Sequence, residues 1–435
     1  MRVEESTEPV QTNVPESTTK ELGSIATEGH HDQKPPAEFE FHQQRFRNLA
    51  EKYQARSRIQ KIIDWKRGDR WESPPTAVDF AHAEALHDDE YFDLKKDPEY
   101  LAWQENLQVV MKHLLEKRDP SNHEAQKRKV VMLIMGGGMK SPYAVGQTIG
   151  LHEIGLGNAF DAVVGISGGA GPATYFLGGP EQSRVGGDIW YNEATTKNFI
   201  DFKRVKQIMD VGYIIDAASH GEKSVDFKAV EQSPTELYVV ATDPETYEAK
   251  LINAKTAKPN MAAAVHASMS APLVYNEAIE VNGGRYIDGA FDPMPIQKII
   301  DELHPDDILI LPNTPFMRME SLEVTPGEII FSNILKAAGS VSSVASIGTM
   351  EKFLSAKNQL RASLEWIQKQ NNVDIGILWP PESGLTNLGT DPDKIKSGIL
   401  QGARDLIDQF GEVQPEVVEL YKDAHKQASD PSLAR

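Results

Sequence analysis

A serine between glycines is the residue of this sequence best suited to covalent chemistry. Ser167 is the centre of the run Gly165-Ile166-Ser167-Gly168-Gly169, which follows the apolar residues 162–164. This pattern is typical of a strand that turns sharply into a helix, strains the serine backbone and exposes its hydroxyl. Glycine is needed at such a turn because a Cβ would collide with the neighbouring element. Ser167 is therefore a candidate nucleophile, although ordinary glycine-rich turns share the pattern.

A second glycine run precedes the serine. Residues 129–135 are typical of a buried strand, and Gly136-Gly137-Gly138 follows at once. Pro142 then begins a predicted helix that ends near residue 154, before the strand that leads to Ser167. In such a β-α-β unit the two strand ends lie side by side, so both glycine runs should face one crevice. Backbone N–H groups there could hold an oxyanion, and losing one such donor typically costs about 3 kcal/mol of barrier.

An aspartate further along the chain could activate the serine. Asp288 lies in an Asp-Gly turn that follows a predicted strand, and such a turn is also common in plain hairpins. An aspartate with an ordinary pKa near ~3.9 is a weak base at neutral pH, so it would have to bond Ser167 directly in a partly dry pocket. Asp292 is a rival base. His304 leaves open a Ser-Asp-His triad of the α/β-hydrolase kind, in which further elements usually separate the glycine loop from the nucleophile.

Together these motifs resemble those of the patatin-like phospholipases, a family of serine lipid acyl hydrolases that use a Ser–Asp dyad. The run Gly136-Gly137-Gly138-Met139-Lys140 resembles the glycine-rich loop of the family, with a basic residue at its usual place. Residues 165–169 resemble the nucleophile elbow, and Asp288-Gly289-Ala290 resembles the dyad motif. Residues 240–246 and 267–272 resemble two further blocks, so the likeness extends over about residues 129–410.

The resemblance implies a three-layer α/β/α fold with a mainly parallel central sheet and an N-terminal helical extension. It also implies roles for individual residues. Those residues are the catalytic Ser167 and Asp288, the oxyanion-hole donors Gly136, Gly137, Gly138 and Met139, and the supporting Lys140, Gly165, Gly168, Gly169 and Gly289. Ser141 stands where the family loop usually ends in glycine. This departure leaves open a catalytically weak or non-catalytic lipid-binding relative.

A phosphate-binding loop is another function for the first glycine run. The run lacks the last glycine of Gly-x-Gly-x-x-Gly and the glycine that precedes Lys-Ser in a Walker loop, which disfavours that function. The chain has no cysteine, and no His, Asp and Glu residues have the spacing of metal ligands. We therefore predict no cofactor and no metal.

The composition limits the partners. The 435 residues carry a formal net charge of -19, which disfavours nucleic-acid binding and predicts repulsion from anionic membranes. The first thirty residues lack the apolar core of a secretory signal, and no apolar run approaches the ~20 residues that span a bilayer. We expect a cytoplasmic protein that acts on an acyl lipid or phospholipid. Peripheral membrane contact is left open, and so is the oligomeric state.

Four segments are predicted along the chain. Residues 1–38 form a disordered acidic tail, because they have few large apolar side chains. Residues 39–125 form the helical extension, 126–415 the catalytic domain and 416–435 a polar tail. A basic amphipathic helix over 39–70 either lies on a membrane surface or packs on the core. Within the catalytic domain we predict a helix over 261–269, a hairpin over 279–287, strands at 237–241, 249–253, 308–311 and 373–379, and helices over 327–369 and 391–410.

Overall fold

The computed structural model describes three parts of the chain. They are residues 98–316 apart from 205–206, 273 and 276; residues 356, 360 and 362–367; and residues 372–417 apart from 382. The chain divides into two units, and all of these residues belong to the second. The predicted tail 1–38, the basic helix 39–70, most of the helical run 327–369 and the end of the chain from 418 lie outside the described residues.

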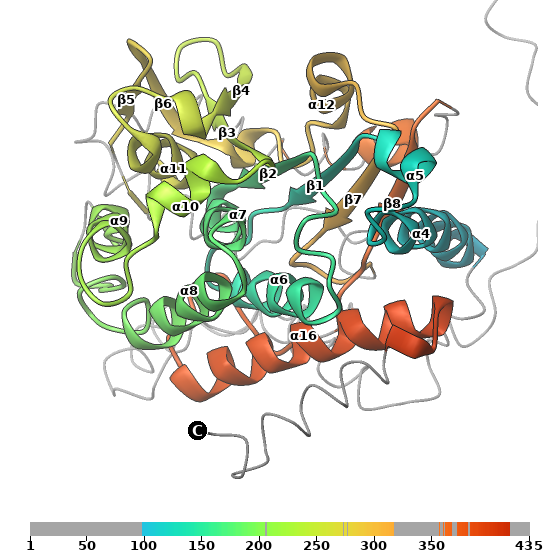
Figure 1. The fold of residues 1–435 in the computed structure, drawn as a ribbon. Helices are drawn as coiled ribbons and strands as arrows, with labels where there is room; N and C mark the ends of the chain where they lie inside the picture. The colour runs from blue at the N-terminus through green and yellow to red at the C-terminus, as the bar shows by residue number, and fades with distance from the viewer. Residues whose placement is uncertain are drawn as a thin grey trace, which may run out of the picture. The chain divides into compact units, whose positions relative to one another are not determined.

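A mainly parallel sheet forms the centre of the described fold (Figure 1). Its strand order is β5-β6-β3-β2-β1-β7-β8, and β4 pairs with β3. The parallel strands are β1 (Val130–Ile134), β2 (Ala162–Ile166), β3 (Glu236–Thr242), β7 (Asp307–Leu311) and β8 (Asp374–Ile377). The antiparallel strands are β4 (Ala249–Asn253), β5 (Ile279–Val281) and β6 (Gly284–Asp288), which lie at the β3 edge. The predicted strands of the catalytic domain are thus present.

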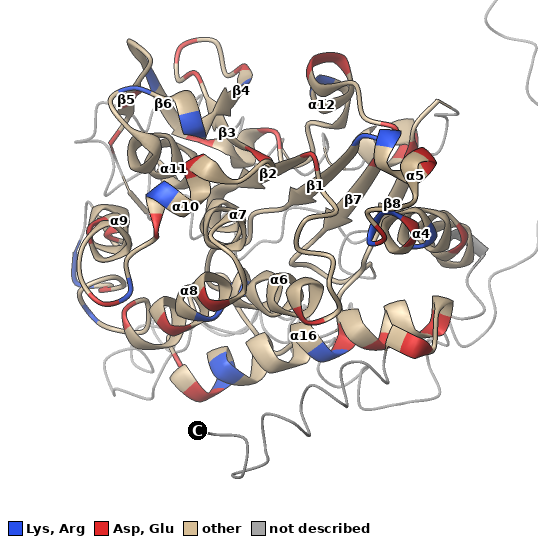
Figure 2. Cartoon of the chain, viewed as in Figure 1, with Lys and Arg blue, Asp and Glu red and all other residues tan. Residues whose placement is uncertain are grey.

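Both faces of the sheet are buried. Met132 and Ile134 of β1 pack into one hydrophobic core, whereas Val131 and Leu133 pack into the other. Successive residues of a strand point to opposite faces, so an apolar run without alternation predicts a strand covered on both sides. The ribbon of the central strands carries hardly any charged residues (Figure 2). The three-layer α/β/α fold is confirmed.

Helices cover both faces of the sheet. The first core is covered by α6 (Pro142–Glu153), α7 (Ala170–Leu177), α8 (Pro180–Asn192), α9 (Val211–Ser219), α10 (Phe227–Gln232), α11 (Met261–Met269) and α16 (Pro392–Val413). The second core includes α12 (Ile296–Leu303). The helix α4 (Pro98–Lys117) packs on the edge strand β8, where Gly376 lies against Leu107, and α5 (His123–Lys127) leads into β1. Short 3-10 turns stand at Gly138–Lys140, Ser167–Gly169, Ala254–Thr256 and Gly289–Phe291.

Two helices that are far apart in the sequence touch through glycine. The helix α6 follows the glycine loop, and α16 runs beside it (Figure 1). A Cβ on Gly146 would overlap the backbone carbonyl of Ile399, and a Cβ on Gly402 would overlap that of Tyr143. Gly150 faces the same partner one turn further along α6, because residues four apart share a helix face. The backbones are therefore in direct contact, and α16 fixes the position of α6.

This contact predicts a large effect of one methyl group. We expect Gly146→Ala to lower the free energy of unfolding by about 1–3 kcal/mol, because a Cβ there forces two backbones apart. The matched control is Gly187→Ala on α8, where a Cβ would meet only the side chains of Ile399 and Val145, both at 3.7 Å. Urea unfolding should show a loss for Gly146→Ala and none for Gly187→Ala. Equal unfolding free energies for the two variants would contradict the contact.

Candidate active site

Ser167 lies at the carboxyl end of β2, where the chain turns through a 3-10 turn into α7. Its φ is 50°, a left-handed conformation that is uncommon for residues other than glycine. The sequence predicted this strain at the serine. A Cβ on Gly165 would lie 2.5 Å from Cα of Ala170, and a Cβ on Gly169 would overlap the end of β1. The turn is thus pressed against its own helix and against the neighbouring strand.

Asp288 reaches the serine from the end of β6. Its Oδ2 accepts a hydrogen bond from Ser167 Oγ at 2.8 Å, and its Oδ1 accepts one from the N–H of Ala290 at 2.7 Å. Asp288 pairs with Ala241 of β3, the strand next to β2, and its side chain is completely buried. Gly289 allows this approach, because a Cβ there would overlap the backbone of Val240. The fold therefore brings together the two residues that the sequence singled out.

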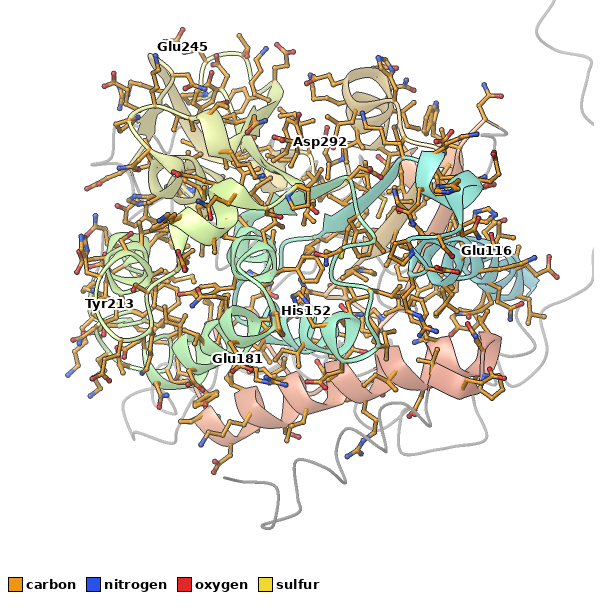
Figure 3. The ribbon with its side chains drawn as sticks, in the orientation of Figure 1. Glu116, His152, Glu181, Tyr213, Glu245 and Asp292 are labelled. Atoms are coloured by element: carbon orange, nitrogen blue, oxygen red, sulfur yellow. The ribbon has the colours of Figure 1, made fainter. Side chains whose placement is uncertain are left out.

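The other candidate bases lie elsewhere. Asp292 accepts a hydrogen bond from the backbone N–H of Met294 and lies between β6 and α12 (Figure 3). His304 ends α12 shortly before β7 begins, so it lies at the amino ends of the parallel strands, opposite the edge that carries Ser167. The partly buried His266 of α11 contacts Tyr275, and burial lowers its pKa to about 4, which keeps it neutral.

Burial dominates the acid–base behaviour of Asp288. It raises the pKa of this carboxyl group from its ordinary value of 3.8 to about 7. The N–H of Ala290 and the hydroxyl of Ser167 act in the opposite direction, because they stabilise the ionised form. A base with a pKa near the working pH combines a useful ionised fraction with real proton affinity. Burial thus gives this aspartate the basicity that a free aspartate lacks.

The glycine loop lies beside the serine. A Cβ on Gly136 would be 2.8 Å from the Cβ of Ser167 and 3.6 Å from its Oγ. Within the described part of the chain, the N–H groups of Gly136-Gly137-Gly138 donate to no other residue. The N–H of Met139 donates to the carbonyl of Asn387 at 3.0 Å, so this predicted donor is already engaged. Met139 thus differs from the three glycines, whose N–H groups have no acceptor among the described residues.

The unusual serine of the loop does not remove a donor. Ser141 has right-handed helical backbone angles, which any residue adopts. Its N–H donates to the carbonyl of Gly138 at 3.1 Å, and the N–H of Lys140 donates to the carbonyl of Gly137. Its side chain is fully buried against Gly168. A glycine at position 141 would use its N–H in the same turn, so the substitution leaves the free donors unchanged.

Two buried polar residues that the sequence analysis missed hold the loop and the elbow. Ser268 on α11 accepts a hydrogen bond from the N–H of Ser167 at 3.0 Å. Asn313 donates from Nδ2 to the carbonyl of Met135 at 2.6 Å and packs against Gly137. Ser268 stood within a block that resembled the family, and Asn313 directly follows a buried strand and a proline. A polar residue at the carboxyl end of a buried strand was the available signal for Asn313.

In the described ranges, His113, Asp307 and Asp374 form a group whose geometry could hold a metal ion. The guanidinium of Arg128 already bonds both carboxylate oxygens of Asp307, at 2.7 and 2.8 Å, and Asp374 at 2.9 Å. The group lies at the amino ends of β7 and β8, away from Ser167. We interpret it as an ion-pair network that ties α4 to the sheet, and the expectation of no metal stays a prediction.

Comparison with known proteins places this geometry in a family. Residues 132–300 match the model of the patatin-like phospholipase family, and they include the glycine loop, Ser167 and Asp288. This region is a patatin-like phospholipase domain. The members of this family are lipid acyl hydrolases.

The other comparisons add little about the patatin-like domain. VipD from Legionella pneumophila is similar in structure at a TM-score of 0.34 and 13% sequence identity, over 66% of this chain and 67% of that one. A likeness at this level carries no argument about function. None of the curated proteins that were compared matches the sequence. No helix in the described residues of the chain combines the length and the apolar character needed to cross a bilayer.

The buried carboxyl group of Asp288 predicts that the protein loses stability as the pH rises toward 7. Because the pKa of Asp288 is higher in the folded protein than in the unfolded chain, its contribution to stability is present at low pH and lost as the pH rises through about 7. Asp288→Asn keeps a neutral group of the same shape. We expect the variant to gain stability relative to the parent as the pH is raised from 5 to 8. Urea unfolding at both pH values measures this difference, and a constant difference would speak against a buried ionisable group.

Proposed function

We propose that the protein hydrolyses acyl esters of lipids, with Ser167 as the nucleophile and Asp288 as its general base. The observation that carries the proposal is the hydrogen bond of 2.8 Å from Ser167 Oγ to the buried carboxylate of Asp288. The patatin-like domain supports a lipid ester as the substrate class. The reactions that fit are those of a phospholipase A, a lysophospholipase or an esterase.

The reaction follows from the positions of the groups. Asp288 takes the hydroxyl proton while Ser167 Oγ attacks the ester carbonyl carbon. The oxyanion then accepts hydrogen bonds from the glycine N–H groups at 136–138, close to the positive end of the α7 dipole. The leaving alcohol takes the proton from Asp288. Water next attacks the acyl-enzyme and gives its proton to Asp288. The bond to Ser167 Oγ then breaks, the fatty acid leaves, and Asp288 returns the proton to Ser167 Oγ.

The surroundings of the pair support catalysis without a histidine. The hydroxyl of Ser167, whose backbone is left-handed, points to Asp288, and Ser268 holds the serine N–H. Burial gives Asp288 a pKa of about 7, close to that of an ordinary histidine. The N–H of Ser141 stays within the turn, as that of a glycine would, and this favours an active enzyme over a non-catalytic relative. Because the substrate is an amphiphile, peripheral contact with a lipid surface remains part of the proposal.

Loss of either member of the pair should abolish the reaction. We expect Ser167→Ala and Asp288→Asn each to lower kcat/KM by at least about a thousandfold, as removal of a nucleophile or its base does in serine hydrolases. The substrates are a p-nitrophenyl ester and a phospholipid, and circular dichroism checks that each variant is folded. Asp292→Asn is the matched control, because it removes a nearby carboxylate that does not bond the serine, and it should retain activity. Full activity of Asp288→Asn would refute the dyad.

The pH profile tests the base independently. Asp288 acts as a base only when it is ionised, and burial raises its pKa to about 7. We therefore expect kcat/KM to rise about tenfold per pH unit below this value and to level off above it. A profile that stays flat down to pH 5 would exclude Asp288 with this pKa. The measurement needs only the parent protein and a p-nitrophenyl ester, with the signal corrected for ionisation of the product.

A further inference from the structure

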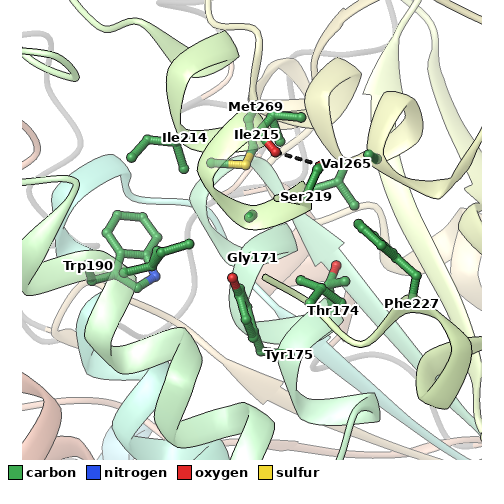
Figure 4. A pocket seen from close by; sticks show the side chains of 14 residues that line it. Gly171, Thr174, Tyr175, Trp190, Ile214, Ile215, Ser219, Phe227, Val265 and Met269 are labelled. Atoms are coloured by element: carbon green, nitrogen blue, oxygen red, sulfur yellow. Dashed lines mark hydrogen bonds between the residues drawn. The ribbon is translucent and has the colours of Figure 1, made fainter. Parts of the chain in front are cut away.

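An apolar pocket lies beside the helix that follows the serine (Figure 4). Its walls come from α7, α8, α9, α10 and α11. Among the residues that line it are Gly171 and Thr174 of α7, Trp190 of α8, Ile214 of α9 and Met269 of α11. All of these elements belong to the first hydrophobic core. The pocket is therefore a gap between helices that are otherwise closely packed.

The hydroxyl groups around this pocket are already satisfied within the protein. Thr174 donates to the carbonyl of Ala170 at 2.8 Å, and Tyr175 donates to that of Lys223 at 2.7 Å. Ser219 donates to the carbonyl of Ile215 at 2.7 Å, the bond drawn in Figure 4. These groups therefore have little left to offer a polar ligand or a water molecule. An occupant of this pocket would be a hydrocarbon.

The pocket is close to the candidate nucleophile. Gly171 follows Ser167 by four residues, through the 3-10 turn Ser167–Gly169 and into the first turn of α7. Met269 adjoins Ser268, whose Oγ accepts the N–H of Ser167. Two of the elements that hold the serine therefore also form walls of the pocket.

Gly171 has no evident packing reason to be glycine. The preceding glycines Gly165, Gly168 and Gly169 are each required, because a Cβ would overlap neighbouring atoms. A Cβ on Gly171 would meet only Cζ2 of Trp190, at 3.9 Å, an ordinary contact. Glycine lowers helix stability relative to alanine, and no close contact at Gly171 accounts for its presence. Here the missing side chain leaves space in the wall of an apolar pocket.

We propose that this pocket binds the acyl chain of the ester cleaved at Ser167, and that Gly171 provides the space that the chain enters. The inference rests on the proposed function and names the part of the substrate that the pocket takes. The cavity volume of about 30 Å³ is two to three times what one water molecule needs. The pocket therefore holds a short stretch of methylene groups, and the rest of a longer chain lies outside it.

Chain-length profiles of matched variants test the pocket. We measure kcat/KM for p-nitrophenyl acetate, butyrate and hexanoate with the parent, Gly171→Ala, Gly171→Leu and Gly187→Ala. Burial of each methylene group strengthens binding about fourfold, so the parent should have a higher kcat/KM for hexanoate than for acetate. We expect the hexanoate-to-acetate ratio to fall at least tenfold in Gly171→Leu and less in Gly171→Ala. The ratio should not change in Gly187→Ala, where the same added methyl group lies outside the pocket. An unchanged ratio in Gly171→Leu, or an equal fall in Gly187→Ala, would overturn the proposal.

A binding measurement separates the pocket from the reaction. Calorimetric titration of octanoate into Ser167→Ala should show binding that weakens at least tenfold when Gly171→Leu is added. If no ester is hydrolysed but octanoate binds in this way, the proposed function fails and the hydrocarbon pocket stands. If esters are hydrolysed with an unchanged chain-length ratio, the pocket fails and the function stands. Circular dichroism identifies a misfolded Gly171→Leu, in which case the chain-length ratios of Gly171→Ala and Gly187→Ala decide between these outcomes.

Discussion

A carboxyl group surrounded by neutral partners is the constraint on which this structure depends. Asp288 is completely buried, and the two hydrogen bonds that it accepts come from a hydroxyl and a backbone N–H. Desolvation therefore opposes its ionisation, and the fold compensates only in part. The strained turn at Ser167, the close approach at Gly289 and the bond from the serine N–H to Ser268 all serve to hold this pair in contact.

Much of the architecture around this pair could be predicted from the sequence, because its signals are local. Apolar runs that end in glycine marked β1 and β2, and the parallel order of these strands placed the glycine loop beside Ser167. An Asp-Gly turn after a predicted strand marked Asp288, and the family resemblance favoured it over Asp292. The helix over residues 261–269 was predicted within its observed bounds as α11. These elements depend on residues close to one another in the chain.

The details of the site could not be predicted, because they depend on contacts between distant residues. The N–H of Met139 is engaged by Asn387, and the carbonyl of Met135 by Asn313. Neither partner lies near the loop in the sequence. The glycines show the same difficulty. In the sequence Gly169 and Gly171 look alike, yet a Cβ would overlap the backbone at the first and make only an ordinary contact at the second.

The contact between α6 and α16 has a consequence for the order of events during synthesis. The helix that follows the glycine loop is held by backbone contacts with residues 399–402, and the loop itself is held by Asn387. A ribosome makes the serine, the aspartate and most of the sheet well before it makes these residues. The nascent chain can therefore form much of the sheet while its glycine loop still lacks the contacts with Asn387 and α16. The candidate site would then take its final shape late in translation.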